Sequence, residues 1–340
     1  MIQARFSKRT FDFKRPAGTS RGVLTEKHAW FIEVWDSSAP ETVGLGECSV
    51  IPGLSPDFDQ FATYEAKLTE VCAHLTSDLT DWPSIKFGVE TALLDLKNGG
   101  KRIIFENDFS KGKRKIVING LIWMGDFAFM QSQIEEKINA GYSTIKLKIG
   151  AIDFQEELAL LTSIRKRFSK EEITLRVDAN GAFSATDALT KLKTLADLDI
   201  HSIEQPIKAR QVEEMAKLCS ITPLPIALDE ELIGVNHLSD KIALLEQIRP
   251  QYIILKPSLH GGISGTKEWI QLAEERSIPW WITSALESNI GLNAICQLAA
   301  EYPNDLPQGL GTGSLYVTNM PSLLEVENGH IYLNYDSQRS

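Results

Sequence analysis

Five short apolar runs in this chain end in a charged residue, and the ends recur at almost constant intervals. Carboxylates end three of the runs, at Asp178, Glu204 and Asp229, which follow one another after 26 and 25 residues. Lysines end the two flanking runs, at Lys148 upstream and at Lys256, which lies 27 residues beyond the last carboxylate. A strand, a helix and two loops have about this length in a (β/α) barrel, whose eight units span roughly 250 residues. The spacing therefore predicts an α/β fold, a TIM-like barrel with these charges together at one mouth.

The chain keeps the same rhythm from residue 116 onward. Amphipathic helical patterns, for example at 154–168 and 186–197, separate the apolar runs. We expect the barrel to occupy residues 116–315. Its expected strands lie at 117–123, 144–149, 174–178, 202–204, 226–229, 252–256 and 280–283, with a weak eighth strand near 309–311.

The first 115 residues have a different pattern. Strand-like runs at 3–8 and 29–36 precede a long stretch of helical periodicity at 58–98. Strands followed by helices favour a small α+β domain, which we expect at 1–115 as a cap on the barrel. The C-terminal residues 316–340 contain one further strand-like run, which we expect to return and pair with this N-terminal domain.

The charge balance restricts the partners of the chain. Its net charge is −10 and 43% of its residues are hydrophobic. A core can therefore be buried, but no excess of positive charge is available to bind nucleic acid or an anionic membrane. The four cysteines are scattered, the N-terminus does not resemble a signal peptide, and no apolar run approaches the roughly 20 residues that span a membrane. We expect a cytoplasmic protein, while its state as monomer or homo-oligomer stays open.

The three carboxylates predict a metal site and a small-molecule carboxylate as the substrate. Converging acidic side chains repel one another unless a cation lies between them, and oxygen ligands suit Mg²⁺ or Mn²⁺. Such an ion also binds a substrate carboxylate and stabilises the enediolate that forms when a neighbouring proton is removed. Lys146 and Lys148 project to one face of their strand, and nearby positive charges favour a neutral lysine there as the base. Lys256 supplies an acid, a base or a fixed cation from the opposite side.

Four residues further along the chain are candidates for substrate contact, and each also has a purely structural interpretation. Ser284 and Glu287 follow the seventh expected strand, where they either contact substrate or merely lead into the cap of the next helix. Gly261 and Gly262 resemble a glycine-rich anion cradle before a helix, or they simply allow a tight turn of the backbone.

Two further residues lie close in sequence to the expected metal ligands Asp178 and Asp229. Asn180 either braces the acid two residues before it or turns the loop, whereas Glu230 is expected to face away from its neighbour Asp229. A single lysine or acid at a strand end is usually a solvated terminus or a helix cap. The prediction of a site therefore depends on all these residues occurring together at the spacing of a barrel.

The chain resembles the muconate-lactonising subgroup of the enolase superfamily in five motifs: Lys146-Leu-Lys148, Asp178-Ala-Asn180, Glu204-Gln-Pro206, Asp229-Glu230 and Lys256-Pro-Ser258. Within that subgroup, the runs at 255–265 and 280–292 and the residue Arg176 are most similar to the o-succinylbenzoate synthase family. The resemblance implies a cap on a (β/α) barrel and a metal-dependent dehydratase. Its substrate would be a hydroxycyclohexadiene carboxylate with a succinyl side chain, and its product would serve menaquinone biosynthesis.

The resemblance also implies roles for single residues. It implies Asp178, Glu204 and Asp229 as ligands of Mg²⁺, Lys148 as the base, Lys256 as a cation beside the enediolate, and Lys146 as a residue that holds or tunes the others. Two capping loops, at 18–22 and 51–55, are implied to close over the substrate. Ser20 and Arg21 in the first loop are therefore candidate contacts, as is Arg176.

Other activities of the same subgroup remain as alternatives. Dipeptide epimerases often carry an Asp-x-Asp pattern after the eighth strand to hold an ammonium group, but residues 309–314 contain no acid. Racemisation of N-succinylamino acids needs no ammonium partner, so this alternative stays open. A barrel that only binds ligands would be expected to lack a metal-binding acid or both lysines, and all of them are present.

Overall fold

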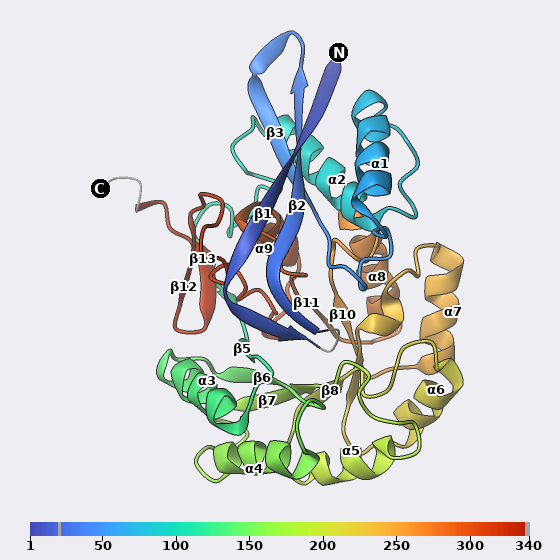
Figure 1. Cartoon of the computed structure of the whole chain (residues 1–340), viewed down its shortest axis with the longest axis vertical. Coiled ribbons are helices and arrows are strands. Elements are labelled where there is room, and N and C mark those ends of the chain that lie inside the picture. The colour runs from blue at the N-terminus through green and yellow to red at the C-terminus, as the bar shows by residue number, and fades with distance from the viewer. Residues whose placement is uncertain (20–21, 337–340) are drawn as a thin grey trace.

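The computed structural model describes residues 1–19 and 22–336, which form two parts (Figure 1). An antiparallel sheet with two helices lies at the top of the view. A curled parallel sheet, with helices around its outside, lies below it. The β1–β2 hairpin reaches down from the upper part toward the curled sheet, so residues of the first part come close to the strands of that sheet.

The upper part has the α+β composition that the sequence predicts. Strands β1 (Ile2–Thr19), β2 (Gly22–Asp36) and β3 (Ala39–Ser49) form an antiparallel sheet in that order. Helices α1 (Phe61–Ala73) and α2 (Pro83–Lys97) cover one face of it, where Trp30 and Ile32 of β2 are buried against Tyr64 of α1. The glycines Gly46 and Gly88 allow α2 to lie close to β3, because a side chain on Gly46 would overlap the backbone of Gly88.

Seven short parallel strands form the curled sheet of the lower part. Their order in space follows the chain: β5 (Gly120–Ile122), β6 (Thr144–Lys148), β7 (Thr174–Asp178), β8 (Ser202–Glu204), β9 (Ile226–Leu228), β10 (Tyr252–Leu255) and β11 (Trp280–Ile282). The helices that connect and follow them are α3 (Phe127–Asn139), α4 (Phe154–Arg165), α5 (Ala188–Ala196), α6 (Val212–Ile221), α7 (Leu238–Ile248), α8 (Gly262–Glu275) and α9 (Asn289–Ala299). Apolar side chains of strands and helices share one large core, as the alternating pattern of the sequence predicts.

The eighth strand expected near 309–311 is not a regular strand. Two single-residue bridges occur there instead, between Thr283 and Gly309 and between Ile118 and Gln308. Pro307 has no N–H group to donate to a ladder. A side chain in place of Gly309 would overlap Thr283. The backbone of this segment therefore packs closely against its neighbours without forming a regular ladder.

The first expected strand and the C-terminal strand also differ from their predictions. The run at 117–123 is divided into β4 (Ile116–Val117) and β5, which belong to different sheets. The C-terminal hairpin of β12 (Leu324–Glu327) and β13 (His330–Leu333) pairs with β4, and not with the N-terminal sheet as expected. The C-terminal part does contact the N-terminal sheet, but through the segment before β12: Tyr316 forms a single bridge with Phe13 of β1.

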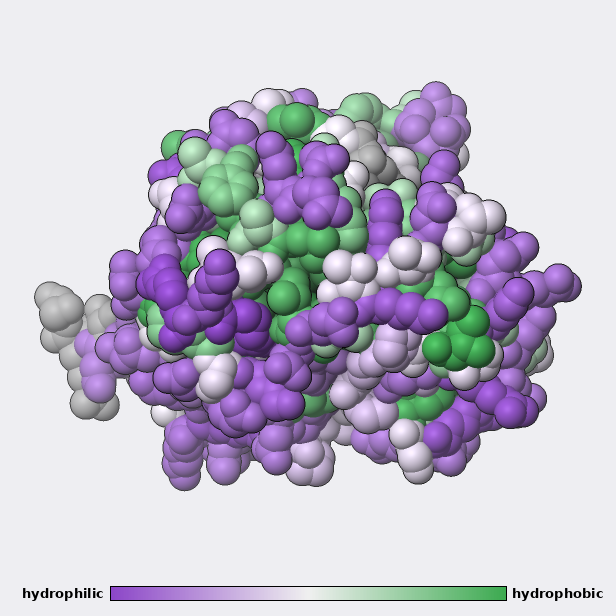
Figure 2. Space-filling model, turned by 90° about the horizontal axis from the view of Figure 1, so that it is seen from below, coloured by the Kyte–Doolittle hydropathy of each residue, from purple (hydrophilic) through white to green (hydrophobic). Residues whose placement is uncertain are grey.

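Figure 2 shows hydrophilic side chains over most of the face seen from below, with apolar groups gathered toward its middle. Among residues 1–19 and 22–336, no helix has the length and apolar character needed to cross a membrane.

Candidate active site

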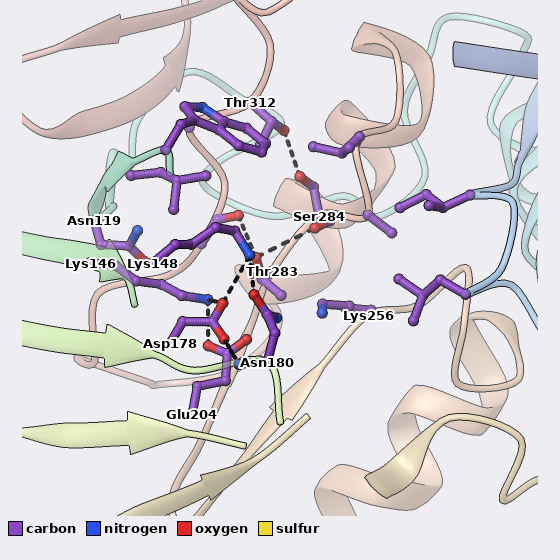
Figure 3. A pocket seen from close by; sticks show the side chains of 18 of the residues that line it. Asn119, Lys146, Lys148, Asp178, Asn180, Glu204, Lys256, Thr283, Ser284 and Thr312 are labelled. Atoms are coloured by element: carbon purple, nitrogen blue, oxygen red, sulfur yellow. Dashed lines mark hydrogen bonds and ion pairs between the residues drawn. The ribbon is translucent and has the colours of Figure 1, made fainter. Parts of the chain in front are cut away.

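A row of charged side chains lies at the carboxyl ends of β6, β7 and β8. The parallel register aligns Lys148 with Asp178 and Asp178 with Glu204. The Nζ atom of Lys146 lies 3.0 Å from Asp178 Oδ2 and also pairs with Glu204. The Nζ atom of Lys148 lies 3.2 Å from the same Asp178 oxygen and donates to Asn180 Oδ1 at 2.7 Å (Figure 3). The strand spacing therefore brings together the residues that the sequence predicts to meet.

The other half of the site comes from β9 and β10. Lys256 follows β10 and forms an ion pair with Asp229, which is fully buried at the end of β9. Lys256 reaches the cavity from the side opposite to Lys146 and Lys148 (Figure 3). Asp229 Oδ1 and Glu204 Oε1 are buried and accept no hydrogen bond from any residue that the structure describes. Buried oxygens of this kind are costly without a positive partner.

Glu230 lines the cavity, which contradicts the expectation that it faces away. Asn180 Nδ2 donates to Glu230 Oε1 at 3.0 Å. The chain turns into a short 3₁₀ helix, Glu230–Leu232, directly after Asp229. The alternation of side chains along a strand ends there, so strand geometry does not predict the direction of the next residue.

Burial and charge together set the protonation of this cluster. Burial raises the pKa of Glu204 well above its usual value, and the neighbouring Asp178 adds to that rise. Burial also opposes ionisation of Asp178, but attraction to Lys146 and Lys148 outweighs it, so the pKa of Asp178 is lowered. Burial alone would lower the pKa of Lys146, yet Asp178 and Glu204 raise it. These acidic neighbours favour the charged form of Lys146. The neutral lysine that the sequence predicts on this strand is therefore not Lys146.

The donor set of Asp178, Glu204 and Asp229 fits a hard divalent cation in its chemistry. The three carboxylates come from consecutive strands, and two of them have a buried oxygen that accepts no hydrogen bond from a described residue. Within the described ranges, however, no three acidic, histidine or cysteine side chains form a ready coordination cluster. Each of the three carboxylates faces a lysine instead. A bound cation would have to replace these contacts.

The charged row opens into a cavity of about 110 Å³. Seven residues predicted as site residues line it: Lys146, Lys148, Asp178, Asn180, Glu204, Lys256 and Ser284. Sequence reasoning missed most of the other lining residues: Leu24, Asn119, Leu121, Trp123, Thr283, Ala285, Leu286, Gly309, Gly311 and Thr312. Asn119, Leu121 and Trp123 alternate along the first expected strand, so strand alternation was the signal that could have found them. Ile51 and Leu54, from the second expected capping loop, also line it.

Two predicted substrate contacts lie behind the cavity wall. Glu287 is fully buried, and it accepts from Ser258 Oγ at 2.5 Å and from Ala285 N at 2.7 Å. Arg176, two residues before Asp178 on β7, is also buried; its guanidinium lies 4.0 Å from the ring centre of Trp281 and donates to the carbonyl of Pro307. Neither residue lines the cavity. The predicted contacts Ser20 and Arg21 lie outside the described residues.

The glycine-rich turn at Gly261 and Gly262 holds a carboxylate of the protein itself. Both glycines have positive φ angles, of 86° and 74°. Glu90, from α2 of the N-terminal part, accepts from Ile263 N at 2.6 Å and from Ser264 Oγ at 2.5 Å, at the start of α8. A side chain on Gly262 would meet Glu90. The cradle predicted for a substrate anion is therefore a docking contact between the two parts.

A second glutamate docks the N-terminal part in the same way. Glu47, at the end of β3, accepts from Ser288 N, Ser288 Oγ and Gly291 N at 2.8, 2.6 and 2.8 Å, at the start of α9. Lys27 of β2 donates to the carbonyl of Ala285 at 2.9 Å. These contacts hold the loop between β11 and α9, which supplies Ser284 to the cavity. Ser284 in turn lies 2.5 Å from the hydroxyl of Thr312 (Figure 3).

Comparisons with known proteins identify the family of this chain. Residues 130–336 match the sequence profile described as "Enolase C-terminal domain-like". The chain is similar to the o-succinylbenzoate synthase of Desulfotalea psychrophila, with 49% identity over 93% of this chain and 95% of that protein.

Solved structures show the same likeness. The crystal structure of MenC from the same organism aligns with a TM-score of 0.87 and 43% identity, over 98% of this chain and 99% of that one. A dipeptide epimerase from Enterococcus faecalis, crystallised with Mg and L-Leu-L-Tyr, aligns with a TM-score of 0.79 but only 21% identity, over 98% of this chain and 96% of that one.

Proposed function

We propose that this chain, which belongs to the o-succinylbenzoate synthase family of the enolase superfamily, is itself an o-succinylbenzoate synthase. The reaction is the syn dehydration of 2-succinyl-6-hydroxy-2,4-cyclohexadiene-1-carboxylate to 2-succinylbenzoate and water, a carbon–oxygen lyase step of menaquinone biosynthesis. The observation that carries the proposal is 49% identity to a synthase over almost the full length of both chains. The lysines on both sides of the cavity are what this chemistry requires.

Asp178, Glu204 and Asp229 would hold the metal ion, Mg²⁺ or Mn²⁺. When bound, the ion acts as a Lewis acid on the substrate carboxylate and stabilises the enediolate as negative charge develops. The buried oxygens of Glu204 and Asp229 support this assignment. The proximity of the three acids also supports it, because burial by itself disfavours their charged forms and a cation would stabilise them.

Lys148 is proposed as the base. It takes the proton from the carbon that bears the carboxylate, and the electron pair of that C–H bond forms the enediolate. The ring C–O bond then breaks, hydroxide leaves with the proton returned by Lys148 as water, and the ring becomes aromatic. Lys256 faces the substrate from the opposite side and stabilises the negative charge. Lys146, held between Asp178 and Glu204, keeps the acids and Lys148 in position.

Several broader proposals accompany this function. We propose that the curled sheet is a barrel closed by the segment at 308–309, that the catalytic domain occupies about 116–315, and that the cap of about 1–115 contributes Ile51 and Leu54 to cover the substrate. The partner is a small-molecule carboxylate, and neither nucleic acid nor a membrane is a partner. The protein acts in the cytoplasm.

An assay with a substrate panel tests the proposal. The purified protein is offered the cyclohexadiene precursor, N-succinylamino acids and dipeptides, each with Mg²⁺ and with a chelator. We expect metal-dependent formation of 2-succinylbenzoate. Epimerisation of dipeptides is not expected, because the cavity wall at 309–312 carries no acid. Turnover of the N-succinylamino acids without dehydration of the precursor would replace the proposal with the racemase alternative.

A further inference from the structure

A second cavity opens beside the first, along the irregular seam of the curled sheet. Its volume is about 260 Å³. Five residues line both cavities: Asn119, Leu121, Trp123, Gly311 and Thr312. Asn119, Leu121 and Trp123 lie on or next to β5. Gly311 and Thr312 follow the irregular segment at 308–309, on the other side of the seam. Because a regular eighth strand is missing, the active-site cavity extends sideways toward α3 and β1.

This lateral cavity has a basic rim. Lys14 and Arg15 of β1 and Lys137 of α3 line it, whereas Glu136 is its single acid among the described lining residues. Lys137 lies 3.8 Å from Glu136. Neither Lys14 nor Arg15 forms an ion pair with a residue in the described ranges, and both are exposed. In a chain of net charge −10, such an excess of positive charge favours an anionic ligand.

The backbone holds the two basic residues over the cavity. The β1–β2 ladder is interrupted between Asp12 and Ala17, so residues 13–16 bulge out where a single residue lies opposite. The bulge is anchored to the far side of the seam: Lys14 N donates to the carbonyl of Leu315 at 2.8 Å, and the Phe13 and Tyr316 rings are 4.9 Å apart. A bulge commonly redirects side chains next to a site.

The inner wall suits an aliphatic chain. Leu121 and Trp123 supply apolar surface on one side, and Leu315 supplies it on the other. Gln133 fixes the backbone of Trp123 from both directions, because its Oε1 accepts from Trp123 N at 3.0 Å and its Nε2 donates to the carbonyl at 3.1 Å. An apolar passage that ends at a basic rim fits an aliphatic arm with a terminal carboxylate.

We propose that this lateral cavity binds the second carboxylate of the substrate, with Lys14 and Arg15 as the residues that select a dicarboxylate. The inference rests on the proposed function and deepens it. The ring carboxylate lies among the lysines and acids of the inner cavity, and the side arm runs between Trp123 and Gly311 into the lateral cavity. Lys14 and Arg15 thus bind the terminal carboxylate of the side arm, while the reaction takes place at the ring of the substrate.

Binding of two product-like probes tests the subsite. The first probe is 2-succinylbenzoate, and the second is 2-butyrylbenzoate, which keeps the ring carboxylate and the keto arm but lacks the terminal carboxylate. Affinities are measured calorimetrically with Mg²⁺ for the wild type and for the double variant Lys14→Gln/Arg15→Gln. The control is Lys111→Gln/Lys113→Gln, which removes the same charge from exposed positions that line neither cavity.

The wild type should bind the dicarboxylate at least about tenfold more tightly than the monocarboxylate, because a single charge-assisted hydrogen bond changes Kd by about this factor. The double variant should lose most of that difference through weaker binding of the dicarboxylate alone, and KM of the precursor should rise with it. The control should keep the difference. Equal weakening of both probes, or no preference in a wild type that still forms product, overturns the subsite. A wild type that binds neither probe and forms no product overturns the proposed function as well.

Discussion

Lys146 and Lys148 are neighbours on one strand, but their surroundings differ. Lys146 is enclosed by Asp178 and Glu204, which raise its pKa. Lys148 contacts one carboxylate and the neutral amide of Asn180, and it lines the same cavity. The residue with fewer acidic partners is the better candidate to accept a proton from carbon.

Replacement of Lys148 by alanine should therefore abolish turnover without removing the metal site. A positioned base contributes about 10² to 10⁴ in rate, and we expect a loss of at least that size in kcat, measured by formation of 2-succinylbenzoate. A Mg²⁺ titration of the same variant should give nearly the wild-type affinity. Normal dehydration by Lys148→Ala would show that the base is another residue.

Replacement of Asp229 by asparagine acts on the metal directly. The change removes the negative charge that pairs with Lys256 and that we propose to bind Mg²⁺. The Mg²⁺ affinity should fall at least about tenfold, since charge and hard oxygen ligands determine binding of this ion. Calorimetric titration measures the effect. An unchanged affinity would remove Asp229 from the ligand set.

At the scale of elements, the starts of α8 and α9 are capped by glutamates that belong to the other part of the molecule. Glu90 bonds the first turn of α8, where backbone N–H groups and the helix dipole favour a negative charge. Glu90→Gln should lower the free energy of unfolding by about 1 kcal/mol, measured by urea denaturation. Glu274→Gln, near the other end of α8, is the matched control: the dipole there disfavours an acid, so this change should be neutral or slightly stabilising. Equal losses in both variants would show that the position on the helix does not matter.

The elements also show what local patterns can predict. Most strands of the curled sheet, and the acids and lysines at their ends, follow from apolar runs and spacing, because these patterns can be read directly from the sequence. The role of Gly261 and Gly262 could not be predicted, since Glu90 lies about 170 residues away in the chain. The direction of Glu230 depends on a 3₁₀ turn after the strand. The division of 117–123 between two sheets depends on β13, whose pairing partner the sequence does not reveal.

At the scale of the whole molecule, a buried lysine lies where the two parts meet. Lys27 is 3% exposed and donates to the carbonyl of Ala285, which follows β11 in the lower part. Burial lowers the pKa of Lys27 to about 8, although Glu287 and Glu47 act in the opposite direction. The charged form is therefore penalised in the folded state.

The pH dependence of stability should reveal this lysine. Below pH 8, Lys27 is protonated in both the folded and unfolded states. Between pH 8 and about 10.5, the unfolded state binds more protons than the folded state, so stability rises with pH. The free energy of unfolding of the wild type, relative to Lys27→Met, should rise by about 3 kcal/mol across that window. Parallel pH profiles for the two proteins would contradict the buried charge.

The central claim is that acids from three consecutive strands bind one cation, with a lysine ready to accept a proton on one side and a second lysine opposite. A crystal structure of the protein with Mg²⁺ and 2-succinylbenzoate tests it most directly. We expect one ion bound by oxygens of Asp178, Glu204 and Asp229, and the ring of the ligand between Lys148 and Lys256. Carboxylates that remain paired with the lysines at saturating Mg²⁺, with no ion between them, would contradict it.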